Sequence, residues 1–307
     1  MHRHPRTALL GATALAAAFT AVSLATPANA SLLGSATPHI HVMKKLDAVK
    51  DKVVPTENRL PLIGGAPVGL PLSYGGGQVE LTNTNYAIFW EPAGHASAPG
   101  YQSLVTRFFN DVGGSTLFNT TTQYYQDLGS GQQNIQNVST FGGAIVDTTP
   151  FPAGGVTDAD LQNMVKKYAG NGYPLNAEYF VYTGPGGEVV SSYCAYHGYV
   201  TISGVNTRYA DEPYGGQSGC TTPTSPNGNP AADSIINTTS HELWESITDP
   251  NTGDGWVALD GDEGSDQCNF EFGSQDAAGA DVYMKGHPYI VQEEWDNNSA
   301  PLGCTMG

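Results

Sequence analysis

The sequence predicts a single domain of the α/β or α+β class, in which a mixed central sheet is flanked by helices. Short runs of β-branched and aromatic residues alternate along the chain with longer runs whose apolar residues recur at helical spacing. Such alternation is typical of a domain built around one sheet. The stretch 75–307 shows no internal repeat, and its length of about 230 residues suits one domain.

Five stretches are expected to be strands, because they are short and rich in Val, Ile, Tyr, Phe or Trp. The first, "NYAIFWEP", stops at Pro92, which cannot donate to a strand ladder. The five span residues 85–92, 142–149, 177–185, 197–204 and 287–295.

Three longer stretches are expected to be helices. Residues 101–114 carry apolar side chains at helical spacing and end at Gly113. Residues 157–174 open with Thr157 as an N-cap. Residues 229–250 have Asn229 as the N-cap and Pro230 at the first helical position.

The residues before this domain are expected to serve export. Arg3 and Arg6 precede an apolar run, and "ANA" at 28–30 is a small-x-small cleavage site, so residues 1–30 are predicted to be a secretory signal peptide. Residues 31–74 are predicted to be an N-terminal extension or linker, compatible with a pro-segment, in which "HVMKKLDAVKDKVV" forms a short basic helix. No later run reaches about eighteen apolar residues, so no membrane span is expected. We therefore expect a secreted, extracellular protein.

Charge and composition limit the classes of partner. The formal net charge is −17, which argues against nucleic acid, because phosphate binding needs a basic surface. An acidic surface is compatible with cation binding. A protein or cell-wall substrate is the partner expected of the function argued below, and the sequence leaves the oligomeric state open.

The four cysteines all lie in the second half of the chain. An even number of cysteines in an exported protein favours two disulfides. Three connectivities are open, of which we expect the pairing of neighbours, Cys194–Cys220 and Cys268–Cys304. A four-thiolate zinc site is disfavoured because no C-x-x-C pair exists. The cysteines are Cys194, Cys220, Cys268 and Cys304.

The stretch "SHELWESITDP" carries the main candidate for chemistry. His241, Glu242 and Glu245 form H-E-x-x-E, one residue away from the H-E-x-x-H helix of zinc proteases. Residues four apart share a helix face, so His241 and Glu245 are candidate metal ligands, and Glu242 beside them is a candidate general base. The alternative is an ordinary polar pair on the helix without any metal.

A third metal ligand has to come from another segment. The acidic stretch after the helix could fold back onto it. Its beginning, "DPNTGDG", alternates oxygen ligands like a calcium loop but lacks the full EF-hand pattern. Zinc is the expected metal because calcium does not favour a histidine, and calcium stays open for the loop. The acids are Asp249, Asp254, Asp260, Asp262, Glu263 and Asp266.

The order of several motifs resembles the exordium-like, or phosphate-induced, family of secreted proteins. The matching stretches are "YGGGQVELTNTNYAIFWEP", "YCAYHG", "SHELWESITDP", "GDGW", "EGSDQC" and "YIVQEEWDNNSAPLGC". They cover most of the chain from Gly75 to Cys304. Plant members carry additional cysteines near "DEPYGGQSGC", so the resemblance does not give the disulfide pattern.

The resemblance narrows the choice of site residues, although it assigns no reaction. Glu263 and Asp266 fall in its E-x-x-D-x-C motif, which favours them as the third ligand. His197 falls in "YCAYHG" and becomes a candidate for stabilising an oxyanion, or for a structural role beside Cys194.

The expected function is a secreted metal-dependent hydrolase, most simply a peptidase with a zincin-like helix. Two alternatives remain open. One is a non-enzymatic cell-wall or carbohydrate-binding protein with a structural metal. The other has no metal, and His241 and Glu245 then form a buried hydrogen-bonded pair.

Overall fold

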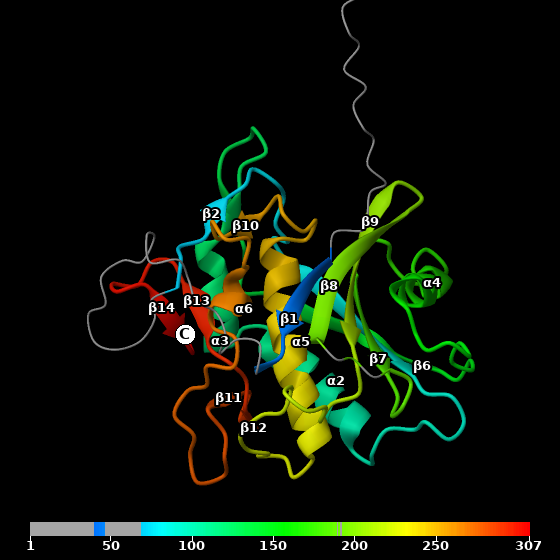
Figure 1. Ribbon diagram of the computed structural model, residues 1–307. Coiled ribbons are helices and arrows are strands. Elements are labelled where there is room, and N and C mark those ends of the chain that lie inside the picture. Colours follow the sequence, from blue (N-terminus) through cyan, green and yellow to red (C-terminus); the bar gives the residue numbers. More distant parts are fainter. Residues whose placement is uncertain (1–39, 47–68, 189, 191) are drawn as a thin grey trace, which may run out of the picture. The chain divides into compact units, whose positions relative to one another are not determined.

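A mixed six-stranded sheet organises the computed structural model, which describes residues 40–46, 69–188, 190 and 192–307. Four neighbouring strands run parallel, and two antiparallel strands extend the sheet at one edge. The fold class predicted from the sequence, a mixed sheet flanked by helices, is therefore confirmed (Figure 1). In spatial order the strands are β1 (Ile40–Lys44), β8 (Tyr193–Ile202), β9 (Val205–Glu212), β7 (Glu178–Thr183), β3 (Asn83–Trp90) and β6 (Ser139–Asp147).

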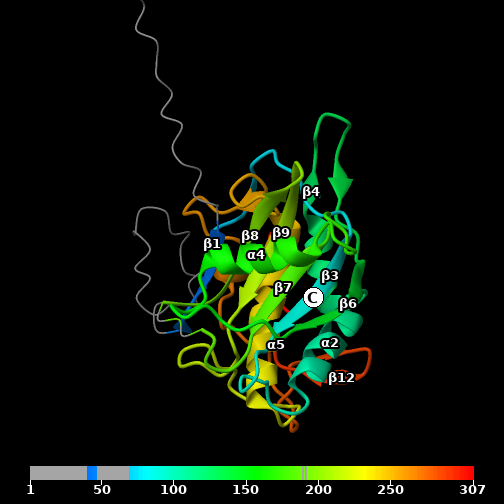
Figure 2. The same ribbon diagram turned by 90° about the vertical axis from the view of Figure 1, so that its right-hand side faces the viewer.

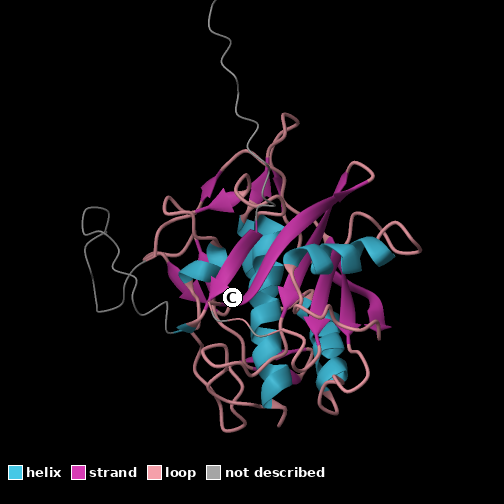
Figure 3. Ribbon diagram, turned by 45° about the vertical axis from the view of Figure 1, so that its right-hand side comes forward, coloured by secondary structure: helices cyan, strands magenta, loops and turns pink. Residues whose placement is uncertain are grey.

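Helices cover both faces of this sheet (Figure 3). Helix α4 lies on one face, and α2 and α5 lie on the other (Figures 1 and 2). The predicted caps are present: Thr157 forms a capping box with Asp160, and the Asn229 side chain accepts the N–H of Ala232. The helices are α2 (Tyr101–Val112), α3 (Thr116–Asn119), the 3₁₀ turn η2 (Thr120–Gln123), α4 (Asp158–Tyr168), α5 (Pro230–Thr248) and α6 (Gly264–Gln267).

Short two-stranded ribbons surround the helices on the α5 side. Each is antiparallel and joins stretches that are two or three residues long. They are β2 (Ser73–Tyr74) with β10 (Trp256–Val257), β4 (Tyr125–Gln126) with β5 (Gln133–Asn134), β11 (Val282–Met284) with β12 (His287–Tyr289), and β13 (Glu294–Asp296) with β14 (Gly303–Thr305).

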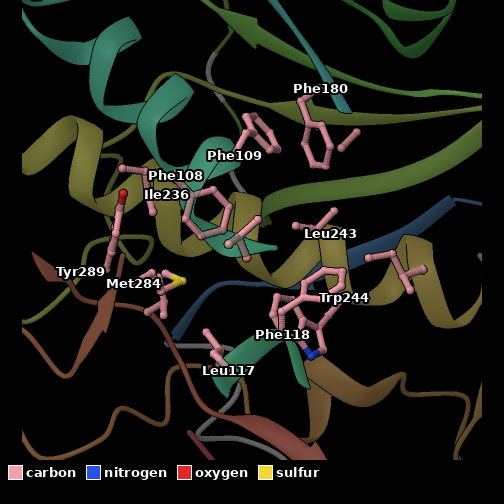
Figure 4. Packing of buried hydrophobic residues seen from close by; sticks show 14 of the residues in the cluster. Phe108, Phe109, Leu117, Phe118, Phe180, Ile236, Leu243, Trp244, Met284 and Tyr289 are labelled. Atoms are coloured by element: carbon pink, nitrogen blue, oxygen red, sulfur yellow. The ribbon is translucent and has the colours of Figure 1, made fainter. Parts of the chain in front are cut away.

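Two apolar cores hold the layers together. The larger joins α2, α3 and α5 to one face of the sheet, where Phe109 packs against Phe180 and Phe118 against Trp244 (Figure 4). The smaller buries Leu161 of α4 with residues of β3, β7, β8 and β9. Helix α5 is buried along nearly its whole length, so most of its side chains, polar ones included, lie inside the protein.

Three local predictions were wrong. The expected basic helix does not form at His41–Lys44, which belong to strand β1; residues 47–54 lie outside the described ranges. Strand β9 was not predicted, because the charged residues Arg208, Asp211 and Glu212 are untypical of a strand. Asp211 and Glu212 are nevertheless buried in it.

The expected strand 287–295 is divided into β12 and β13. Between them the backbone N–H of Gln292 donates to the side-chain oxygen of Asn237 on α5, at 2.7 Å. At Gln292 this N–H is therefore bonded to the helix and not to a neighbouring strand.

The predicted neighbour pairing of the cysteines is what the structure contains. Cys194 is bonded to Cys220 and Cys268 to Cys304, so no cysteine is free. The predicted signal peptide lies outside the described residues, and among those described no helix is long and apolar enough to cross a membrane.

Candidate metal centre

Helix α5 places the H-E-x-x-E residues on its side away from the large core. Leu243 and Trp244 point among the aromatic side chains of that core (Figure 4). His241 and Glu245 lie one turn apart, with 3.1 Å between Nε2 of the histidine and Oε1 of the glutamate. The side chains of both residues are fully buried.

The acidic return loop does fold back onto α5. Helix α6 packs against α5, and the backbone N–H of Asp266 donates to Oε1 of Glu245 at 3.1 Å. This contact brings Oδ1 of Asp266 to 3.8 Å from Nε2 of His241. The Cys268–Cys304 disulfide anchors the end of α6.

The edge strand β1 and its neighbour β8 bring two further histidines to the same place. His197 on β8 and His41 on β1 are directly opposite each other in the antiparallel ladder, so both side chains face α5. Their ring centres are 6.1 Å apart. His197 is fully buried, whereas the side chain of His41 is 20% exposed.

Glu263 completes the cluster between the two strand histidines. Its Oε2 is 3.4 Å from Nε2 of His197, and its Oε1 is 3.4 Å from Nδ1 of His41. Nε2 of His41 also contacts Oδ2 of Asp266 at 2.5 Å. The seven side chains form three overlapping groups that contain Glu245 in common: His41–Glu245–Glu263, His197–Glu242–Glu245 and His241–Glu245–Asp266.

Many polar atoms of this cluster have no hydrogen-bond partner although they are buried. Both ring nitrogens of His197 are unpaired, as are both oxygens of Glu242 and both of Glu263. Leaving a buried polar atom unpaired costs about 1–3 kcal/mol, and more for a charged one. These unpaired atoms belong to residue types that bind metal ions, so the cluster is a candidate metal site.

Burial and mutual repulsion shift the acid–base properties of the cluster. Burial, followed by repulsion from Glu245, raises the pKa of Glu242 and of Glu263 well above the ordinary value. Burial lowers the pKa of His197 to about 3, so that its ring is neutral near pH 7. Burial also opposes charge on His41, but attraction to Glu245 and Asp266 prevails and raises its pKa to about 9.

Gln292 fixes the orientation of the His241 ring. The Gln292 amide nitrogen donates to the backbone oxygen of Ser265 at 2.7 Å, and its oxygen accepts the N–H of Phe270 at 3.4 Å. That oxygen therefore accepts the Nδ1–H of His241, 3.2 Å away. Nε2 is then the ring nitrogen that faces Glu245. Burial opposes charge on this ring, but attraction to Glu245 prevails and raises the pKa of His241.

The predicted site residues thus lie together, but not all in the expected way. His241, Glu245 and Asp266 form one group, and Glu263 and His197 lie beside it. His197 has its Nε2 among carboxylates, which suits a metal ligand better than an oxyanion donor.

The other acids of the loop have different partners. Asp249 accepts backbone N–H groups of Gly253, Asp254 and Gly255, so its oxygens hold the turn "DPNTGDG" together. Asp262 pairs with Lys44 at 3.2 Å. None of the candidate metal groups among the described residues includes these acids or Asp260.

Two residues of the centre were not predicted from the sequence. His41 lay in a segment interpreted as an extension, although "HIHV" alternates histidine with β-branched residues as a strand does. Gln292 lay in a stretch interpreted as a continuous strand, and nothing in the local pattern distinguished it.

Comparisons with known proteins leave the family open. No family model matches the chain, and no match was found among curated proteins or solved structures. The resemblance to the exordium-like family therefore stays a prediction that rests on the order of the motifs.

Proposed function

We propose that the protein is a secreted metal-dependent hydrolase whose α5 helix works like that of a zincin peptidase. His241, Glu245 and Asp266 bind the metal, which is zinc, and Glu242 is the general base. When bound, zinc polarises a carbonyl and lowers the pKa of a water molecule to about 7.

The observation that supports this proposal most strongly is the set of unpaired ligand atoms around Glu245. A hydrogen-bonded pair without metal explains the 3.1 Å contact of His241 with Glu245. It does not explain why the adjacent His197, Glu242 and Glu263 are buried with so many unpaired atoms. The two disulfides suit the oxidising space outside the cell.

Glu242 is the group available for proton transfer. Both of its oxygens lack partners, and it groups with His197 and Glu245. Its raised pKa, due first to burial, is the direction expected of a carboxylate that accepts a proton near neutral pH.

The burial of the centre favours a second candidate function, a structural metal in an extracellular binding protein. The side chains of His197, His241 and Glu245 are fully buried, and only His41 offers partial exposure. In a structural site all positions are filled by protein ligands, whereas a catalytic site keeps one open.

The substitution Glu242→Gln separates the two candidates. For a hydrolase, it lowers the rate on peptide substrates by about 10²–10⁴-fold, because the base is lost, while the zinc content stays unchanged. Glu91→Gln, at the end of β3 and hydrogen-bonded to Gln102, is the matched control and keeps full activity. The assay measures cleavage of a fluorogenic peptide library together with zinc content.

Zinc-bound wild type that cleaves no peptide would favour the structural metal. Full activity of Glu242→Gln would remove Glu242 from the mechanism.

A further inference from the structure

The cluster has two halves that meet at the carboxylate of Glu245. Its Oε1 faces Nε2 of His241 at 3.1 Å, and its Oε2 faces Nε2 of His197 at 3.7 Å. The two oxygens of one carboxylate therefore point to two different histidines, as they do when a carboxylate bridges two ions.

The half around His197 has a ligand set of its own. Nε2 of His197 and Oε2 of Glu263 are 3.4 Å apart, and neither has a hydrogen-bond partner. The third member of this half is Oε2 of Glu245, which also lacks a partner. These atoms come from β8, from the residue that precedes α6, and from α5.

The spacing of these atoms is that of ligands around an ion. Ligands at about 2.0–2.2 Å from a tetrahedral zinc are about 3.3–3.6 Å from one another. The contacts of His197 with Glu263 and Glu245, at 3.4 and 3.7 Å, are close to this range. They are too long for good hydrogen bonds to a ring N–H, whose usual donor–acceptor distance is about 2.9–3.0 Å.

We propose that the protein holds two divalent transition-metal ions bridged by the carboxylate of Glu245. His241 and Asp266 bind the first ion, and His197 and Glu263 bind the second. His41 contacts both Glu263 and Asp266 and so closes the centre from strand β1. The first ion is the one in the proposed function, on which this inference rests; the second ion goes beyond it.

Metal stoichiometry tests the second ion. The intact secreted protein is stripped with a chelator, titrated with Zn²⁺ in a calorimeter, desalted and analysed for zinc. Wild type is expected to bind two equivalents and His197→Ala one. His287→Ala, whose exposed side chain pairs with Asp111 on α2, is the matched control and binds two.

The possible outcomes distinguish the two claims. If wild type binds one zinc ion per protein, the second ion is refuted and the proposed function stays intact. If wild type binds no zinc, both proposals are refuted. Two equivalents in a folded His197→Ala protein would also refute the assignment.

A second measurement does not depend on the folding of any variant. X-ray absorption of zinc-loaded wild type is expected to show a zinc–zinc distance of about 3.5–4 Å, as in other two-metal sites. Spectra without such a feature would contradict the bridge.

Discussion

At the scale of single residues, His197 is the hardest to explain without an ion. A neutral imidazole always carries one N–H, and both nitrogens of this buried ring lack a partner. A salt bridge would need a charged ring, which burial opposes by lowering its pKa to about 3. In the proposed centre a metal ion would resolve the conflict, because metal ions bind the neutral form of the ring.

The orientation of His241 by Gln292 leads to a prediction about affinity. Gln292→Met keeps the volume of the side chain but removes the acceptor for Nδ1–H of His241. Zinc affinity is expected to fall about 10–100-fold, the usual effect of losing such a partner of a metal-binding histidine. Gln162→Met on α4, across the sheet, is the control and keeps wild-type affinity in competition titrations. Equal affinities would mean that Gln292 does not position the ring.

At the scale of elements, the bounds of α5 could be predicted because the signals that define them lie within or beside the helix itself. These signals are its N-cap, its first proline and its apolar spacing, and they also predicted that His241 and Glu245 share a face. The position of His41 has a non-local cause, because it depends on β1 pairing with β8 more than 150 residues later. Patterns within a short window contain no information on such pairing.

The Cys268–Cys304 bond is expected to support the centre through α6. Replacing both cysteines with alanine frees the end of the helix that carries Asp266. We expect about 2–5 kcal/mol lower stability and weaker zinc binding. Denaturant unfolding and zinc titration of the double variant measure the two effects. Lower stability with unchanged zinc affinity would show that α6 holds its place without the bond.

Asp147 connects β6 to α4 and gives a pH-dependent prediction. Burial raises the pKa of this carboxyl, but hydrogen bonds from Lys167, Thr149 and Tyr168 outweigh it and lower the pKa to about 2. The stabilisation is therefore complete above the unfolded pKa of about 3.9 and is lost as the pH falls towards 2.

The substitution Asp147→Asn measures this effect. It is expected to cost roughly 1 kcal/mol at pH 6, a modest value because the Lys167 side chain is 46% exposed and solvent screens the pair. The difference from wild type should narrow between pH 4 and pH 2 in urea unfolding experiments, where wild type protonates the same group. A difference that does not change with pH would contradict the ionic origin.

At the scale of the whole molecule, the centre lies where four segments meet. The segments are β1, β8, α5 and the region of α6; β1 is far from the other three in sequence, whereas α6 follows α5 with only the short strand β10 between them. The sequence could nominate Glu263 and Asp266 from motif order but could not choose between them. The fold brings both to the cluster: Glu263 lies next to His197 and Asp266 next to His241, and both also contact His41.

The central claim is that this meeting point binds metal, and diffraction at the zinc absorption edge tests it most directly. Crystals of the zinc-loaded protein are expected to show an anomalous peak about 2.0–2.2 Å from Nε2 of His241 and from an oxygen of Glu245 and of Asp266. A second peak is expected beside Nε2 of His197. No peak at either place, with Nε2 of His241 donating a hydrogen bond to Glu245, would contradict the account and establish a cluster without metal.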